Sequence, residues 1–474
     1  MIRTQFYRCY SLIFTVFIFA TGCCCKNYDQ PYTLPTPTPC QTSSAVFCAG
    51  VEKVEITPTN GVPLAGWGGR HLGFIDLNPF NYHTYLKPSE GTLDPLYARS
   101  LVMDNGSERV CIVTIDASGS DGELVALAHR KAVAKGFSIP IEKVLFCASH
   151  THSGPGAMTN KRLWAFAAAD LCVDEVREKF TDKIAESMVK AEKNMVPARI
   201  GIGTDSVGGV TRNRRANLSP HLDVSDVDTQ LGIIKVDDLN GSTLATVWNF
   251  AIHGTSYGDD NLKYSADNMG QVSAFVEGAC GGVALFINGS EGDTAPDRSI
   301  AEIRTIIGNA IKVKRPLIPM DSWVELKTAH EIVNFGNPQI DASLQRVQSI
   351  THGQLDFLDF LEAYGITPGA TFTMSSRWAE NKFRFQAIRI GRTLLSSVPG
   401  EPIYSLGKLV KEDAEGMGYD NAFVCSLANN HMGYITTKEE YDICGYEGFA
   451  TLFGPTTGER VRNACHRVAE AIKP

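Results

Sequence analysis

The sequence lacks an excess of basic residues, because Lys and Arg number 44 against 52 Asp and Glu in 474 residues, a formal net charge of −8. Nucleic-acid binders concentrate positive charge to displace phosphate counterions, so this balance argues against that class of protein. After residue 45 the chain also lacks internal repeats, low-complexity runs and any apolar segment long enough to cross a membrane. The composition, 43% hydrophobic and 20% charged residues, is that of a globular chain able to bury a sizeable core.

Paired cysteine motifs are also missing from the body of the chain. Of 13 cysteines, four lie in the first 25 residues, and Cys40 and Cys48 flank the start of the expected folded part. The other seven are scattered without a CxxC pair, several of them in apolar runs. This favours single buried thiols over a disulfide framework or a Cys-type zinc site, with one or two disulfide bonds still compatible with an oxidising compartment.

The first 25 residues are typical of an export signal. Two arginines precede an apolar run, residues 9–20, that is too short for a transmembrane helix. The run ends in Ala20-Thr21-Gly22-Cys23, which resembles a bacterial lipobox, with Cys24 or Cys25 as alternative lipidation sites. A plain secretory signal or an N-terminal anchor are the other interpretations, and all three place the protein outside the cytoplasm. The protein is then either secreted or periplasmic, or attached to a membrane surface through a lipid.

Residues 26–44 are rich in Pro and Thr and predict an extended tether, followed by one domain over residues 45–474. Within that domain, short apolar strands alternate with helices. The strands are expected at residues 109–116, 143–148, 199–203, 230–236, 246–252, 282–287 and 384–390, and the helices at 121–135, 173–195, 271–279, 302–313 and 459–472. This alternation predicts an α/β fold, a single large catalytic domain with a mixed, mostly buried sheet flanked by helices. Residues 328–364 show no clear period and are interpreted as a helical insertion that covers a site.

Metal-binding residue types cluster where the predicted strands end. The strand at 143–148 runs into His150-Thr151-His152 and then Gly-Pro-Gly, and in an extended segment residues two apart face the same side. Two ordinary surface histidines are the alternative, but this spacing before a forced turn favours metal or acid–base chemistry. The strand at 246–252 delivers His253 to another glycine turn, followed by Ser265 as the expected N-cap of a helix.

Two further strand ends carry polar turns. Residues 288–292 (NGSEG) place the first glycine wrongly for a G-x-S-x-G nucleophile elbow, and no Gly-Lys-Ser/Thr follows to form a phosphate loop. Glu401 lies in the turn Val-Pro-Gly-Glu-Pro, and two His with one acid form a common catalytic zinc set placed at strand ends. A tyrosine-rich segment over residues 431–446 is by default read as core aromatics.

In this order the segments resemble the neutral (non-lysosomal) ceramidase family. The resemblance covers residues 45–472 and is most specific at 150–156 (HTHSGPG) and 434–437 (YITT), with 66–69, 94–99, 213–214, 253–255 and 398–401 in support. It implies a zinc amidase that cleaves the N-acyl bond of ceramide into sphingosine and a fatty acid. By the same resemblance, the zinc ligands are His150, His253, Glu401 and Tyr434, and the residues that line the reacting amide are His152, Arg214 and Tyr446.

The chemistry suits these residue types. Zinc lowers the pKa of a bound water, so that hydroxide is available to attack an amide. An imidazole such as His152 can pass a proton to the leaving amine, and Arg214 or Tyr446 can donate a hydrogen bond to the developing oxyanion. One departure lies at Ala295, where the family has a serine held to be catalytic; Thr294 beside it is expected to face the other way. Retention of the whole metal set favours attack by zinc-activated water. The second departure is length, because family members continue into an immunoglobulin-like domain and this chain stops at Pro474.

Three interpretations therefore follow from the sequence. The first is an exported zinc amidase acting on ceramide or a related N-acyl lipid, reached through an N-terminal lipid anchor. The second keeps the fold and the metal but changes the substrate to another amide or ester. The third, motivated by Ala295, is a catalytically weakened lipid-binding surface protein.

Overall fold

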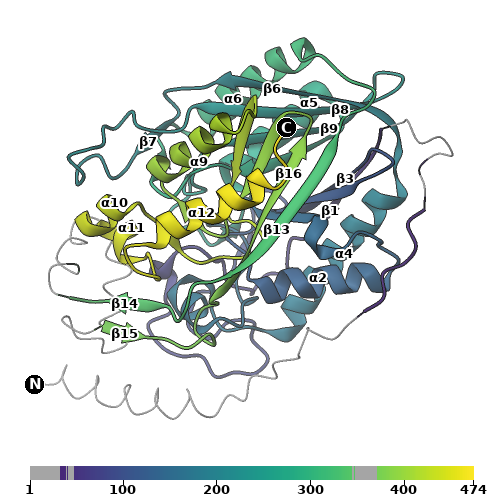
Figure 1. Ribbon diagram of the computed structural model, residues 1–474. Coiled ribbons are helices and arrows are strands. Elements are labelled where there is room, and N and C mark those ends of the chain that lie inside the picture. The colour runs from purple at the N-terminus through teal and green to yellow at the C-terminus, as the bar shows by residue number, and fades with distance from the viewer. Residues whose placement is uncertain (1–31, 39, 41–46, 344–345, 347–370) are drawn as a thin grey trace, which may run out of the picture.

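The computed structural model describes residues 32–38, 40, 47–343, 346 and 371–474 (Figure 1). Its centre is an eight-stranded mixed sheet in the order β11-β9-β8-β6-β1-β3-β4-β5. The strands are β1 (Cys48–Glu55), β3 (Tyr97–Asp104), β4 (Arg109–Ile115), β5 (Val144–Ala148), β6 (Val196–Ser206), β8 (Gln230–Asp238), β9 (Thr243–Phe250) and β11 (Val283–Asn288). Neighbours are antiparallel except at the two edges, where β4 pairs with β5 and β9 with β11 in parallel.

A four-stranded sheet, β13-β16-β17-β19, packs against the first. It comprises β13 (Leu326–Asn334), β16 (Lys382–Ile390), β17 (Thr393–Ser397) and β19 (Asn421–Cys425), with β17 and β19 parallel. Between the sheets, apolar residues of β4 and β8 meet Ile388 and Phe423 in one buried cluster. A Cβ on Gly232 would lie 2.7 Å from the Phe423 ring, so the sheets approach there too closely for a side chain.

Helices cover the outer faces of both sheets. The helices of the described residues are α2 (Gly122–Ala134), α3 (Arg162–Trp164), α4 (Asp174–Lys193), α5 (Asp267–Cys280), α6 (Ile300–Lys314), α9 (Tyr404–Gly416), α10 (Lys438–Ile443), α11 (Gly445–Phe449) and α12 (Thr457–Glu470). The same residues include 3₁₀ turns at Gly68–Arg70, Ile141–Lys143 and Arg315–Leu317 and a π turn at Ala165–Ala169. Helices α2 and α4 cover one half of the large sheet and α5 and α6 the other, while α9 and α12 cover the small sheet (Figure 1). The result is a helix–sheet–sheet–helix sandwich.

This architecture confirms the predicted α/β fold with a mixed, buried sheet, and every predicted strand and helix lies within an observed one or overlaps it. The helical interpretation of residues 328–364 is wrong for 328–334, which belong to β13 and pair with β16 along its whole length, and for 339–341, which form a short strand, β14. Because β13 is an edge strand that alternates exposed and half-buried residues, it lacks the apolar run that marks the central strands. Residues 344–345 and 347–364 of that prediction lie outside the described residues.

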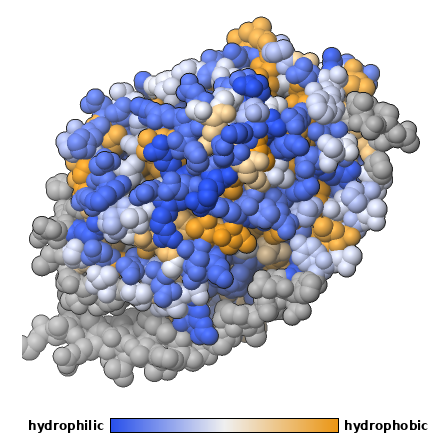
Figure 2. Space-filling view, viewed as in Figure 1, coloured by the Kyte–Doolittle hydropathy of each residue, from blue (hydrophilic) through white to orange (hydrophobic). Residues whose placement is uncertain are grey.

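Four two-stranded pairs complete the fold. They join β2 (Gly91–Thr92) to β10 (Lys263–Tyr264), β7 (Thr211–Asn213) to β12 (Thr294–Pro296), β14 (Gln339–Asp341) to β15 (Thr371–Thr373), and β18 (Glu401–Pro402) to β20 (Tyr434–Ile435). Among the described residues, no helix is both long and apolar enough to span a bilayer. The face in Figure 2 is largely hydrophilic, with apolar side chains in scattered patches.

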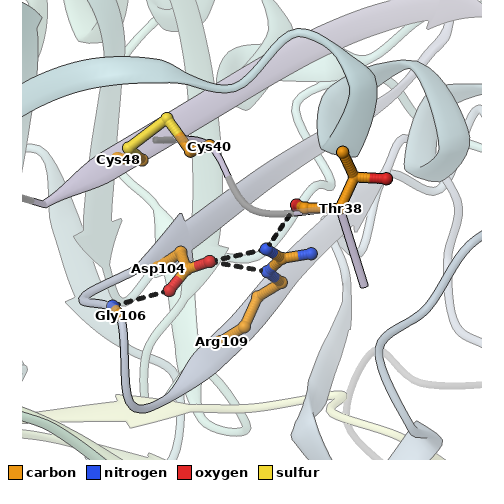
Figure 3. The surroundings of a disulfide bond; sticks show 6 residues. All are labelled: Thr38, Cys40, Cys48, Asp104, Gly106 and Arg109. Carbon is orange, nitrogen blue, oxygen red and sulfur yellow. Dashed lines mark hydrogen bonds and ion pairs between the residues drawn. A yellow bond between two sulfur atoms is a disulfide. The ribbon is translucent and has the colours of Figure 1, made fainter. Parts of the chain in front are cut away.

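The described part of the expected tether lies against the domain. A disulfide joins Cys40 to Cys48 at the start of β1, and Nη2 of Arg109 donates to the Thr38 carbonyl at 2.9 Å (Figure 3). Further back, the hydroxyl of Tyr32 lies 3.1 Å from Nδ1 of His129 on α2. Residues 32–38 are thus docked on the domain, which extended proline-rich backbone permits because its carbonyls stay free to accept. The expected signal segment, residues 1–25, lies outside the described residues.

Candidate metal centre

The carboxyl ends of strands from both sheets meet at one edge of the sandwich. Strand β5 ends two residues before His150, β9 ends three residues before His253, and β17 ends four residues before Glu401. Glu401 in β18 lies directly opposite Tyr434 in β20, in a parallel pair. Four segments that are far apart in sequence therefore deliver the predicted metal ligands to one place.

Close backbone contact locks the two histidine turns together. Thr151 forms a parallel bridge with Gly254, and the amide of His152 donates to the Gly254 carbonyl at 2.9 Å. A Cβ at Gly254 would lie 2.3 Å from the carbonyl oxygen of His150, so this position accepts glycine alone. The glycine after His253 is therefore required for the histidines to approach.

Both histidines of the HxH segment point into the centre as predicted, but for a different reason. His150 has φ 69°, in the left-handed region, and the segment is a turn rather than an extended strand. The prediction of an extended backbone at this position was therefore wrong. A non-glycine residue held in this region stores strain of about 1–3 kcal/mol, a feature that gathers at functional sites.

The ligand atoms lie within a few ångströms of one another. Nε2 of His150 is 3.0 Å from Nε2 of His253 and 3.2 Å from Oε2 of Glu401, and the latter two atoms are 3.6 Å apart. Nε2 of His152 is 3.3 Å from Nε2 of His150. All four side chains are buried.

Backbone carbonyls determine the tautomers of two of these rings. Nδ1 of His150 lies 2.6 Å from the Ser118 carbonyl, and Nδ1 of His253 lies 2.9 Å from the Glu291 carbonyl. A carbonyl can only accept, so each Nδ1 carries the proton and each Nε2 presents a lone pair to the centre. Two lone pairs and a carboxylate oxygen thus face one another. Such a donor set fits a bound cation, and two imidazoles with one carboxylate suit zinc among other divalent metals.

The electrostatics also favour a positive charge here. Burial opposes protonation of His150, but the Glu401 carboxylate outweighs it and raises the pKa of His150 to about 8. Burial would raise the pKa of Glu401, yet His150 and its neighbours hold it well below the usual value. Burial, together with the positive charges nearby, lowers the pKa of His152 and of His253 well below 6.5. Without a metal, the Glu401 carboxylate therefore faces a charged His150, while His152 and His253 stay neutral. A bound cation would take the place of the proton on His150.

The other predicted residues adjoin this cluster. The Tyr434 hydroxyl lies 3.4 Å from Nε2 of His253 and accepts from Nη2 of Arg214 at 3.0 Å. Arg214 is held by Glu447 at 2.7 Å and by the Gly292 carbonyl at 2.8 Å, and its guanidinium lies over the rings of Tyr434 and Tyr446. Burial raises the pKa of Tyr434 well above 10, and the Glu401 charge adds to this. All seven predicted site residues thus gather at one place.

Two residues without a predicted role also belong to the centre. Nε2 of His431 lies 3.1 Å from Oε1 of Glu401, and the Glu291 carboxylate falls within 4.8 Å of the ligand atoms of His150 and Glu401. Burial raises the pKa of Glu291 to about 8. His431 begins the tyrosine-rich segment and Glu291 lies in the NGSEG turn, but nothing local in the sequence ties either residue to a metal.

The structure also shows where the expected helix cap Ser265 and the residue pair Thr294 and Ala295 lie. The helix after His253 starts at Asp267 with Ala266 as N-cap, so Ser265 precedes the observed cap site, although its hydroxyl still accepts from the Asp267 amide at 3.0 Å. Ala295 lies in β12 opposite Arg212 and is partly exposed. Thr294 is buried instead, with its hydroxyl directed to the Ser290 carbonyl.

A pocket opens over the centre. His150, His152, Glu401, His431, Tyr434 and Tyr446 supply its polar part. Its walls are mostly small or apolar side chains: Ala65, Leu124, Met158, Trp164, Ala167, Ala168 and Ala169. Asp121, Ser118, Ser120 and Thr159 add further polar groups to the lining. A pocket that combines the donor cluster with apolar walls suits a ligand with a polar reacting group and a hydrocarbon chain.

A family model and curated relatives match this chain over most of its length. The family model described as "Neutral/alkaline non-lysosomal ceramidase, N-terminal" matches residues 74–306 and 366–463. Neutral ceramidase B of Dictyostelium discoideum is 23% identical over 69% of this chain and 60% of its own length, and neutral ceramidase of Pseudomonas aeruginosa is 25% identical over 66% and 57%. The chain thus spans about three fifths of the length of these curated relatives.

Solved structures match over more of the chain. The crystal structure of neutral ceramidase from Pseudomonas aeruginosa superimposes with a TM-score of 0.73 at 21% identity, covering 91% of this chain and 76% of the other. A structure titled "Ceramidase complexed with C2" gives a TM-score of 0.74 at 21% identity, covering 91% and 77%. At this identity the match establishes the shared fold.

Proposed function

Because this chain belongs to the neutral/alkaline non-lysosomal ceramidase family, we propose that it is a zinc-dependent amidase that hydrolyses ceramide, or a related N-acyl sphingolipid, to sphingosine and a fatty acid. The observation that carries the proposal is the set of buried electron-pair donors in a pocket with apolar walls. His150, His253 and Glu401 would hold the metal, with the Tyr434 hydroxyl as the further ligand. A zinc ion bound there supplies Lewis acidity and lowers the pKa of water, so that an unreactive amide can be attacked near neutral pH.

His152 is suited to move the proton. It lines the pocket beside His150, and its Nδ1 has no hydrogen-bond partner among the described residues although it is buried. The chain therefore leaves one imidazole nitrogen uncommitted next to the reacting groups. In the proposed reaction His152 takes a proton from the attacking water and gives it to the departing amine.

Arg214 and Tyr446 are suited to stabilise negative charge on the amide oxygen. Arg214 is fixed by Glu447 and by the Gly292 carbonyl, so its orientation is set before substrate arrives. The Tyr446 ring stands 5.2 Å from that of Tyr434 and lines the pocket. Preorganised donors of this kind act on the transition state because they need no rearrangement during the reaction.

The apolar wall supports a lipid substrate. Leu124, Met158 and Trp164 with the run of alanines over 167–169 offer a surface for an acyl or sphingoid chain. Export, and contact with the membrane through an N-terminal lipid anchor, complete the proposal and rest on the first 25 residues. Hydrolysis of another amide or ester by the same centre is the neighbouring possibility, and Ala295 favours a second candidate, a lipid-binding protein of weak activity.

Zinc content and hydrolysis of a fluorescent short-chain ceramide test the proposal together. We expect about one zinc per chain and release of fluorescent fatty acid, both lost in His150→Ala. Bound zinc without turnover of any N-acyl lipid would favour the lipid-binding candidate. Turnover of a simple N-acyl amide or ester but not of ceramide would keep the mechanism and change the substrate.

A further inference from the structure

Glu291 follows β11 in the turn that fails as a nucleophile elbow, and it is fully buried. Its backbone carbonyl accepts from Nδ1 of His253 at 2.9 Å and so orients that ring. Its side chain turns to the same centre, because a carboxylate oxygen of Glu291 lies within 4.8 Å of ligand atoms of both His150 and Glu401. One residue thus acts on the centre through its backbone and its side chain.

The carboxylate of Glu291 has few polar neighbours. Neither oxygen has a partner in ordinary hydrogen-bond geometry among the described residues, and the Ser426 hydroxyl is a side-chain donor close to it. Oε2 of Glu401 also has no hydrogen bond in ordinary geometry, although Nε2 of His150 lies 3.2 Å from it. Buried carboxylates without hydrogen bonds are costly and are normally found paired with a cation or a metal.

We propose that Glu291 is a further metal-binding residue of this centre, whose carboxylate together with that of Glu401 balances the two positive charges of the ion. The inference rests on the metal centre of the proposed function and is independent of the substrate. Ligands of one zinc ion stand about 2.0–2.2 Å from it. The donor atoms of His150, Glu401 and Glu291 lie within 4.8 Å of one another, close enough to approach one ion.

This role explains why a buried acid occupies the turn. With Glu291, two imidazoles, two carboxylates and the Tyr434 hydroxyl would surround the ion, and the two carboxylates would balance its two positive charges. In the metal-free protein no divalent cation offsets the burial of these two carboxyl groups. Metal binding should therefore stabilise the fold more strongly than one carboxylate would allow.

The test uses the full chain with the near-isosteric variant Glu291→Gln. Zinc affinity is measured by competition with a chromogenic chelator, and thermal unfolding is followed with and without zinc. We expect zinc affinity to fall about 10- to 100-fold, in the range found when supporting groups of metal sites are removed. We also expect the variant without metal to be no less stable than wild type, so that its gain in melting temperature on adding zinc is smaller.

Two further variants separate charge from packing. Glu380→Gln makes the same change in a half-buried carboxylate, one held by the Gly122 amide and by Lys161, and should leave zinc affinity unchanged. Glu291→Asp keeps the charge and should lose less affinity than Glu291→Gln. Equal zinc affinity in wild type and Glu291→Gln, or equal losses in Gln and Asp, would overturn the proposal. Absence of ceramide hydrolysis by a wild type that binds zinc tightly would overturn the proposed function alone.

Discussion

Replacing Arg214 with Lys tests the arrangement of donors around the proposed amide site. Arginine there makes three hydrogen bonds in a fixed fork: Nε to Glu447 at 2.7 Å, Nη2 to the Gly292 carbonyl at 2.8 Å and Nη2 to the Tyr434 hydroxyl at 3.0 Å. A lysine ammonium keeps the charge but is a single point on a flexible stem, so it cannot satisfy all three directions. Glu447 keeps its second partner, Arg215, at 2.8 Å and is not left unpaired.

The expected magnitude follows from the orientation that lysine cannot keep. The three hydrogen bonds hold the guanidinium in place, so without them the cation is no longer fixed where the amide oxygen would lie. Loss of one donor to a developing oxyanion costs about 2.7–4 kcal/mol, and because lysine keeps the charge we expect a decrease of about 2–4 kcal/mol in transition-state stabilisation, or about 30- to 1000-fold in kcat/KM. Because the missing donor acts on developing charge, the decrease should fall mainly on kcat.

The assay is hydrolysis of a fluorescent short-chain ceramide, with unfolding in urea measured in parallel. Arg212→Lys is the matched control, since Arg212 lies two residues away with an exposed side chain and an exposed partner, Asp297. It should change neither kcat/KM nor stability. If Arg214→Lys keeps kcat/KM within about threefold of wild type while folding normally, the assigned role of Arg214 is wrong.

Three further outcomes are expected. Gly254→Ala forces a Cβ to within 2.3 Å of the His150 carbonyl oxygen and should abolish zinc binding, so normal zinc binding by this variant would contradict the packing argument. Gly278→Ala, where nothing lies within 4 Å of the added Cβ, should raise the urea midpoint slightly. Ala295→Ser should change kcat/KM by less than about threefold, and a gain of about 100-fold would instead indicate a serine nucleophile. Burial lowers the pKa of His129 below its value in the unfolded chain, so the unfolded state binds the extra proton first. The free energy of unfolding should therefore fall as pH drops from about 6.5 to 5, and His129→Gln should make it less dependent on pH. An unchanged pH dependence in the variant would exclude His129 as its source.

Local patterns predicted most of the fold. Strands such as β4 and β5 are apolar along nearly their whole length because both of their faces are buried, and this signal survives in the sequence. The edge strand β13 could not be recognised because one face is exposed and its residues alternate with polar ones. The docking of residues 32–38 was also invisible, since a proline-rich segment looks the same whether free or bound to a domain.

Some residues of the candidate site could likewise be predicted from the sequence, and others could not. The sequence by itself determined the residue types and their turns: an HxH segment and a histidine before a glycine, each at the end of an apolar strand, and a glutamate on a Pro-Gly turn. Resemblance to a family supplied Tyr434, Arg214 and Tyr446. Only the tertiary structure brought His431 and Glu291 to the centre, because their approach depends on two sheets packing so that strand ends over 100 residues apart converge. Which side chains meet there depends on how the two sheets pack, and the helix or strand periodicity of a short segment cannot predict it.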